Sequence, residues 1–158
     1  MDVKTLILHP ERCNNCKECE TACIESRTSL TSPGLSCIRI LKTNEEDFFF
    51  PIACKQCENP PCQATCPKEA IYRDAELDRV LIDRQKCVGC GMCVSACPFG
   101  AMKLDKKKAK SYKCDLCQGD PECVKVCEPT AIEYVPVEKL SYPNMVYMAG
   151  KLARLKKP

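Results

Sequence analysis

Short apolar runs alternate with polar loops along this chain, and they predict short elements. Val80 to Asp83 is typical of a short strand, and Ile71-Tyr72 fits its hairpin partner across the polar segment Arg73 to Arg79. Ile38 to Leu41 predicts another strand, after the loop Thr31 to Gly34. We therefore expect an α+β fold of short strands, short helices and many loops.

The segment 143–158 has an amphipathic pattern of its own. A helix can begin at Asn144, and apolar residues then recur at intervals of three and four on one face, namely Met145, Met148, Leu152 and Leu155. Positive charge follows at Arg154, Lys156 and Lys157. We expect this C-terminal tail to pack on its own domain or on a partner, and the pattern does not decide between them.

No apolar run approaches the roughly 18 residues of a membrane span. Leu6 to Leu8 is too short for the apolar core of a secretory signal, which needs about 7–15 residues. The sequence thus predicts no direct membrane span and a cytoplasmic location, although export together with a signal-bearing partner stays open. In such a reducing compartment, clustered cysteines bind metal more often than they form disulfides.

The composition indicates that cysteine is the residue type that carries the function of this chain. Cysteine supplies 17 of the 158 residues, whereas the chain has one His and no Trp. Lys and Arg total 24 against 21 Asp and Glu, and a net charge of +3 is too small for a nucleic-acid groove.

Sixteen cysteines fall into four groups of four, and Cys37 stands alone. Group one is Cys13, Cys16, Cys19 and Cys23, and group two is Cys54, Cys57, Cys62 and Cys66. Group three is Cys87, Cys90, Cys93 and Cys97, and group four is Cys114, Cys117, Cys123 and Cys127. Three residues separate the last two cysteines of every group, which suits the start of a short helix. Similar segments follow groups two, three and four, so the chain repeats a short unit.

The spacing C-x2-C-x2-C-x3-C-P of group three is the bacterial ferredoxin pattern, in which three cysteines hold one 4Fe-4S cluster and the fourth holds its neighbour. Two-residue gaps let a loop fold around three corners of a cube, while the x3 step carries the last thiolate away. Four groups therefore predict four 4Fe-4S clusters in two exchanging pairs. Each oxidised cluster with its thiolates carries about −2, so the formal +3 becomes roughly −5.

Other uses of cysteine fit less well. Zinc sites commonly use two separated C-x2-C pairs, whereas these cysteines are packed into short runs; a zinc-binding interaction module is therefore a remote alternative. The sequence also lacks the C-x3-C-x2-C motif of radical enzymes. The position of the third cysteine of that motif is occupied by Ser26, Glu69, Gly100 and Thr130 in the four groups.

From Leu6 to Tyr134 the chain resembles the four-cluster iron-sulfur electron-transfer subunits of molybdenum and tungsten oxidoreductases, hydrogenases and carbon monoxide dehydrogenases. The four groups and the run Lys113-Cys114-Asp115-Leu116-Cys117 carry the resemblance. It implies nested ferredoxin-like modules: an outer one from 1–53 and 98–142, and an inner one from 54–97. Spacing alone leaves pairing of adjacent groups open, and Cys23 and Cys127 lack the directly following proline.

The resemblance also implies the ligands of each cluster. Cluster 1 takes Cys13, Cys16, Cys19 and Cys127, and cluster 2 takes Cys114, Cys117, Cys123 and Cys23. Cluster 3 takes Cys54, Cys57, Cys62 and Cys97, and cluster 4 takes Cys87, Cys90, Cys93 and Cys66.

The expected function is a relay for single electrons, since four clusters leave little room for a substrate pocket. We expect no catalytic residues, and a hetero-oligomer with a catalytic subunit, such as a tungsten or molybdenum aldehyde oxidoreductase or a carbon monoxide dehydrogenase. The second redox partner would be a flavoprotein, a ferredoxin or a further subunit. A free polyferredoxin that shuttles between enzymes is the alternative.

Three further features are expected to be structural. His9 should be a surface or second-sphere residue and not a ligand, because every cluster already has four thiolates. Cys37 should be a small buried apolar residue. The lysines at 106, 107, 108, 110 and 113 should be solvated, with docking to an acidic partner or raising a nearby cluster's potential as alternatives.

Overall fold

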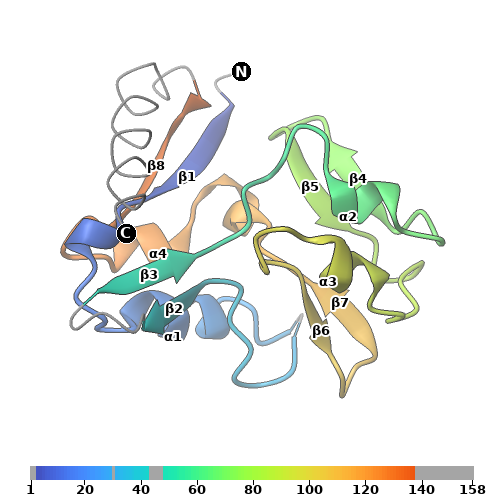
Figure 1. The fold of residues 1–158 in the computed structure, drawn as a ribbon, viewed down its shortest axis with the longest axis horizontal. Coiled ribbons are helices and arrows are strands. Elements are labelled where there is room, and N and C mark those ends of the chain that lie inside the picture. Colours follow the sequence, from blue (N-terminus) through green and yellow to red (C-terminus); the bar gives the residue numbers. More distant parts are fainter. Residues whose placement is uncertain (1–2, 30, 43–47, 138–158) are drawn as a thin grey trace, which may run out of the picture.

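Paired strands and short helices make up the computed structural model, which describes residues 3–29, 31–42 and 48–137 (Figure 1). The antiparallel pairs are β1 (Lys4–Leu8) with β8 (Ile132–Pro136), β2 (Arg39–Lys42) with β3 (Phe49–Ile52), β4 (Ile71–Asp74) with β5 (Arg79–Ile82), and β6 (Lys103–Asp105) with β7 (Lys110–Tyr112). The helices are α1 (Glu18–Glu25), α2 (Pro61–Ala64), α3 (Met92–Ala96) and α4 (Glu122–Lys125), with the 3-10 turns η1 (Pro10–Arg12) and η2 (Leu116–Gly119). The expected α+β class is confirmed.

The two ends of the described chain are joined by β1 and β8. Their register runs from Lys4 opposite Pro136 to Leu8 opposite Ile132. The backbone N–H of His9 then donates to the carbonyl of Ala131 at 2.8 Å. Because of this pairing, the loop that follows β1 and contains the first cysteines of group one lies beside the end of group four.

The hairpins β4–β5 and β6–β7 repeat one design. Asp74 pairs with Arg79 across the first hairpin, and Asp105 pairs with Lys110 across the second. Each aspartate carboxylate accepts hydrogen bonds from the backbone of its own turn: Asp74 from the N–H of Leu77, and Asp105 from the N–H groups of Lys107 and Lys108. Such side-chain contacts are typical of Asp in turns. The residue before the second strand is left-handed in both, at φ 47° for Asp78 and 48° for Ala109.

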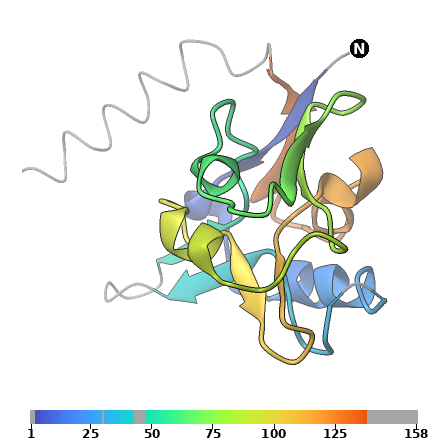
Figure 2. The ribbon, with the colours of Figure 1, turned by 90° about the vertical axis from the view of Figure 1, so that its right-hand side faces the viewer.

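Two separate clusters of buried side chains form the core. The first joins the beginning and end of the chain and includes Leu6, Cys37, Ile38, Leu116 and Ile132. The second includes Ile71, Val80 and Met102 and lies between the hairpins. In Figure 1 the first occupies the side of α1, α4, β1 and β8, and the second the side of α2, α3 and β4. Figure 2 shows α2 and α3 next to each other, in agreement with their contacts.

Local patterns predicted several elements correctly. The β4–β5 hairpin and β2 are confirmed, although β4 extends to Asp74 and shortens the turn. A helix occupies the x3 step of every cysteine group, as expected. Strands β1, β3, β6, β7 and β8 were not predicted, because runs of three to five residues are too short to show a clear period.

The predicted C-terminal tail, 143–158, lies outside the described residues. Within the described part, no helix is both long and apolar enough to cross a membrane.

Candidate metal centres

Three cysteines of group one share a cavity with the last cysteine of the chain. Cys13, Cys16, Cys19 and Cys127 line it together with apolar side chains that include Ile132. The first three come from the loop before α1 and from its first turn, and Cys127 follows α4. The β1–β8 pairing and the contact of α1 with α4 bring these segments together.

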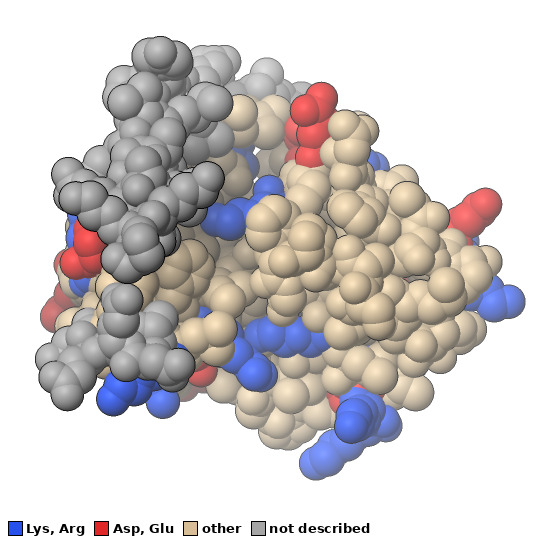
Figure 3. All heavy atoms as spheres, viewed as in Figure 1, with Lys and Arg blue, Asp and Glu red and all other residues tan. Residues whose placement is uncertain are grey.

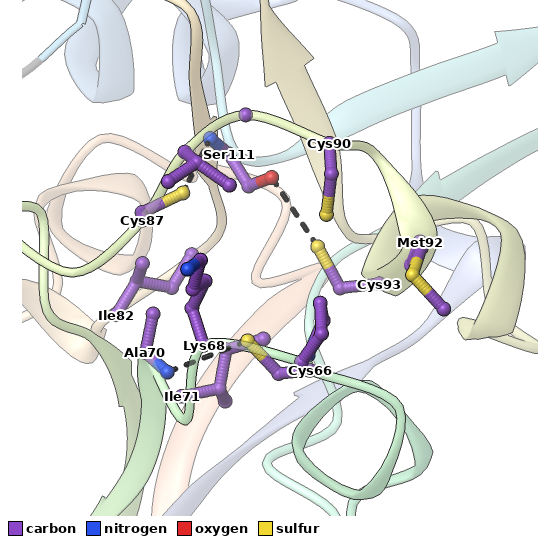
Figure 4. Close-up of a pocket in the computed structure, with 13 residues that line it drawn as sticks. Cys66, Lys68, Ala70, Ile71, Ile82, Cys87, Cys90, Met92, Cys93 and Ser111 are labelled. Atoms are coloured by element: carbon purple, nitrogen blue, oxygen red, sulfur yellow. Dashed lines mark hydrogen bonds between the residues drawn. The ribbon is translucent and has the colours of Figure 1, made fainter.

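The two central groups exchange their last cysteines in the same way. One cavity is lined by Cys54, Cys57, Cys62 and Cys97, and another by Cys87, Cys90, Cys93 and Cys66. Figure 4 shows the thiols of the second set facing a common space, with Ile71 and Ile82 on one side and Ser111 on the other. The packing of α2 against α3 makes both combinations, because each helix carries the third cysteine of one set and leads into the fourth of the other.

The remaining predicted set is Cys23, Cys114, Cys117 and Cys123. Burial raises the pKa of the Cys123 thiol, and the neighbouring sulfurs of Cys114, Cys23 and Cys117 raise it further. The pKa of Cys117 is raised by burial first and then by Asp115 and Cys23. These thiols therefore lie close enough to shift the pKa of their neighbours.

A repeated turn positions the last cysteine of groups two, three and four. The residue three positions later is left-handed, with φ 48° at Glu69, 61° at Gly100 and 50° at Thr130. The N–H of each donates to the carbonyl of its cysteine at 3.0–3.3 Å. The next residue is an alanine that is at most 2% exposed, at positions 70, 101 and 131. The N–H of Ala70 reaches Cys66 Sγ at 3.3 Å, so the turn places a donor on the sulfur.

Group one uses a different donor. Helix α1 continues past Cys23, and the N–H of Cys37 donates to Cys23 Sγ at 3.3 Å. The hydrogen bond from the Cys37 side chain lowers the pKa of Cys23 to about 5. Cys37 is only 1% exposed, which confirms the expected burial. Its contact with a candidate ligand was not predicted, because the two cysteines lie 14 positions apart in the sequence.

Other predicted ligands lie in environments that disfavour a free thiolate. Burial raises the pKa of the Cys19 thiol to about 12 and that of Cys114 to about 12. A cysteine coordinates metal as the thiolate, so the positive charge of bound iron would have to offset this burial. Two of the cavities each include one exposed cysteine, Cys16 beside Cys13, Cys19 and Cys127, and Cys90 beside Cys66, Cys87 and Cys93.

The donor set fits an iron-sulfur cluster. Backbone N–H groups point at sulfur in two of the sets, since Leu116 donates to Cys114 Sγ and Ser111 to Cys87 Sγ, both at 3.4 Å. Hydrogen bonds of this kind tune cluster potentials. Among the described residues, no group of three or more His, Cys, Asp or Glu side chains is placed to hold one metal ion.

Two lysines of the basic stretch approach the cysteine loops. Lys110 Nζ donates to the carbonyl of Cys87 at 2.5 Å. Lys113 is only 4% exposed, so the prediction that it is solvated was wrong; its side chain turns inward and donates to the carbonyl of Cys114 at 2.7 Å. Lysines 106, 107 and 108 are exposed, as expected.

His9 lies between two carboxylates. Its Nδ1 is 3.4 Å from Glu11 and its Nε2 is 3.3 Å from Glu133. The cavity of Cys13 and Cys127 does not include it among its lining residues.

Sequence reasoning missed Gln56, Arg27 and Ser111. Ser111 Oγ is hydrogen-bonded to Cys93 Sγ at 3.2 Å. Arg27 is 7% exposed and pairs with Asp115 at 2.5 Å. Gln56 links two segments, because its Nε2 donates to the Cys114 carbonyl and its Oε1 accepts the N–H of Val80. A polar residue inside or beside a cysteine group is the only local signal they carry.

Thiols gathered in fours by one-turn helices and short hairpins define a ferredoxin-like iron-sulfur protein. A family model described as a 4Fe-4S dicluster domain matches residues 45–137, and one described as a 4Fe-4S binding domain matches residues 10–23. The chain therefore belongs to the 4Fe-4S dicluster domain family, and the expected membership among iron-sulfur electron-transfer proteins is confirmed.

Relatives agree with this assignment. The chain is 37% identical over 147 residues to the putative electron transport protein YsaA of Escherichia coli (strain K12), covering 85% of this chain and 91% of that one. It is 37% identical to an uncharacterized ferredoxin of Methanocaldococcus jannaschii, over 90% of this chain and 78% of the relative. The polyferredoxin-like subunit of an aliphatic sulfonate oxidoreductase from Pyrococcus furiosus is 33% identical, over 77% of this chain and 70% of that subunit.

Proposed function

We propose that the chain is an electron-transfer subunit that relays single electrons through four 4Fe-4S clusters between a catalytic oxidoreductase subunit and a second redox partner. The observation that carries the proposal is the sharing of cysteines: in each of three cavities, three cysteines of one group lie together with one of another. In the remaining set, the sulfurs of Cys114, Cys23 and Cys117 raise the pKa of Cys123. Sharing of cysteines between groups is how paired clusters are held in bacterial ferredoxins. The iron ligands would be the same sixteen cysteines.

The pairing supported by this geometry is nested. Clusters 1 and 2 share groups one and four, and clusters 3 and 4 share groups two and three. The outer module would comprise 1–53 and 98–142 and the inner module 54–97, in keeping with the two buried clusters of side chains. Met102 belongs to the second cluster of buried side chains, together with Ile71 and Val80. The second segment of the outer module, 98–142, would therefore begin with residues that contact the inner module.

Electrostatic interactions between thiols of different sets support the order 1, 2, 3, 4. Cys19 of cluster 1 raises the pKa of Cys123 of cluster 2, after burial and closer sulfurs. Cys54 of cluster 3 contributes in the same way to the raised pKa of Cys114, which belongs to cluster 2. The exposed cysteines, Cys16 and Cys90, then belong to the first and last clusters. A relay with its exposed ligands at opposite ends suits exchange with two different partners.

The surface near one end is suited to a partner protein. Figure 3 shows few charged side chains over α2 and α3. Met92 of α3 is 48% exposed, and Val88 and Phe99, which precede and follow α3 in the chain, are 54% and 45% exposed. Large exposed apolar side chains that gather on one face are typical of interaction sites. We assign no catalytic residue to the chain.

The proposed catalytic partner is a tungsten or molybdenum aldehyde oxidoreductase or a carbon monoxide dehydrogenase, and the second partner a flavoprotein, a ferredoxin or a further subunit. The relative that is a subunit of an aliphatic sulfonate oxidoreductase supports a permanent complex. The relative named a ferredoxin supports the second candidate, a free polyferredoxin. A cytoplasmic location stays a prediction that cell fractionation tests.

The experiment is metal and sulfide analysis of the protein purified anaerobically from its host by an affinity tag. Four clusters require about sixteen irons and sixteen sulfides per chain. Tungsten, molybdenum or nickel in the same preparation identifies the catalytic subunit, and iron alone favours the free shuttle. Zinc without sulfide would contradict the proposal.

Single cysteine variants test the pairing. In the nested arrangement, Cys97→Ala and Cys62→Ala abolish the same electron paramagnetic resonance signal. Adjacent pairing of groups three and four predicts that Cys97→Ala instead matches Cys117→Ala. Cys37→Ala is the matched control, since this cysteine is buried but belongs to no set.

A further inference from the structure

Lys113 is a buried cation between two of the cysteine sets. It follows β7 and directly precedes Cys114, and it is only 4% exposed. Its Nζ donates to the carbonyls of Val80 and Cys114 and to Gln56 Oε1, the last at 3.2 Å. All three acceptors are uncharged, so hydrogen bonds satisfy the ammonium while its charge stays uncompensated.

Other buried cations of the same region have carboxylate partners. Arg27 pairs with Asp115 at 2.5 Å, and Arg79 pairs with Asp74 at 3.0 Å. Within the described ranges, Lys113 has no ion pair with a carboxylate. Burying an unpaired ammonium costs several kcal/mol in free energy, so such charges are found beside an opposite charge.

The cysteine sets supply that opposite charge. Lys113 lines the cavity of Cys54, Cys57, Cys62 and Cys97, and its carbonyl neighbour Cys114 belongs to the adjacent set. An oxidised 4Fe-4S core together with its four thiolates carries a net charge of about −2. A thiolate-bound cluster in this cavity would place that negative charge next to the Lys113 ammonium.

We propose that the Lys113 ammonium is the shared counter-ion of clusters 2 and 3 and raises their reduction potentials above those the same ligands would give without it. This inference rests on the proposed ligand sets. Reduction adds one electron to a cubane and takes its core from +2 to +1, while the neighbouring cluster that gives the electron is oxidised. The added negative charge is stabilised by a nearby cation in a site of low dielectric constant.

The position gives this charge a role in the relay. Clusters 2 and 3 are the inner members of the proposed order, and the electron crosses there from one module to the other. A fixed cation at this crossing stabilises the electron in the middle of the molecule. Gln56 holds the ammonium in place, because its amide bridges the Cys114 carbonyl, the Val80 N–H and Lys113 Nζ.

The experiment compares reduction potentials of the fully loaded chain, measured by redox titration with electron paramagnetic resonance. Lys113→Met should lower the reduction equilibrium constants of clusters 2 and 3 tenfold or more, which is about 59 mV or more for a one-electron couple. Lys113→Arg keeps the charge and should restore the potential. Lys106→Met removes an exposed lysine of the neighbouring hairpin and should leave every potential unchanged.

Gln56→Glu keeps the proposal testable if Lys113→Met does not fold. It replaces the amide by a carboxylate of the same size beside Nζ, and it should also lower the potential by neutralising the ammonium. Unchanged potentials in both variants at full iron content would overturn this inference alone. A wild-type chain that does not bind about sixteen irons would instead overturn the proposed function.

Discussion

At Gly89 the backbone of a cysteine loop lies close to the turn of the β6–β7 hairpin. Gly89 lies between Cys87 and Cys90 with φ +70°, and a Cβ added there would stand 2.3 Å from the carbonyl oxygen of Ala109 and 2.6 Å from its carbon. Both atoms are backbone, so one segment must move. We expect Gly89→Ala to separate the loop from the β6–β7 hairpin.

The control is in the same loop. Gly91 has φ +79°, but an added Cβ would meet nothing within 4 Å. Gly91→Ala therefore carries only the cost of a left-handed alanine, about 1–2 kcal/mol. Gly89→Ala carries the same cost and an overpacking cost of about 1–3 kcal/mol, for a total of about 2–5 kcal/mol.

Thermal unfolding under anaerobic conditions measures the difference. In a protein of this length, about 1 kcal/mol lowers the melting temperature by about 2–4 °C, so Gly89→Ala should melt well below Gly91→Ala. Because Ser111, on the same hairpin, bonds to Cys93 Sγ and Cys87 Sγ, Gly89→Ala should also lose about four of sixteen irons. Equal stability and equal iron content in the two variants would refute the steric argument.

Three other substitutions test the polar contacts. Hydrogen bonds hold the pKa of Asp105 below its usual value against the effect of burial, so Asp105→Asn should lower the melting temperature at neutral pH. In thermal unfolding, this advantage of the wild type should be present above about pH 4 and disappear as the carboxyl is protonated at lower pH, and a pH-independent difference would contradict it. Ser111→Ala removes the hydroxyl beside Cys93 Sγ and should lower one cluster's potential by about 20–60 mV, from a hydrogen bond of about 0.5–1.5 kcal/mol, whereas Ser95→Ala on the exposed side of α3 should not. Cys37→Ala should keep the full iron content and lower the melting temperature, because it removes a buried sulfur; loss of iron would make Cys37 a ligand.

Several features of the chain were predictable because they depend on neighbours in sequence. The gaps of two residues within a cysteine group set the loop, and the gap of three sets a helix, as found at α1 to α4. The short apolar runs Ile71-Tyr72 and Val80 to Ile82, with a polar turn between them, predicted β4 and β5 for the same reason. The class of metal site follows from such local spacing, since a loop can enclose a cluster corner by corner.

The tertiary structure alone decided which cysteines share a cavity. Cys13 and Cys127 meet because β1 pairs with β8, a contact between distant segments whose strands carry little local signal. The same holds for Lys113: its charge predicted a solvated side chain, and only the packing of β7 between two cysteine sets buried it. Long-range pairing and burial depend on every segment at once, so the sequence determined the kind of centre, and the fold determined its partners and its surroundings.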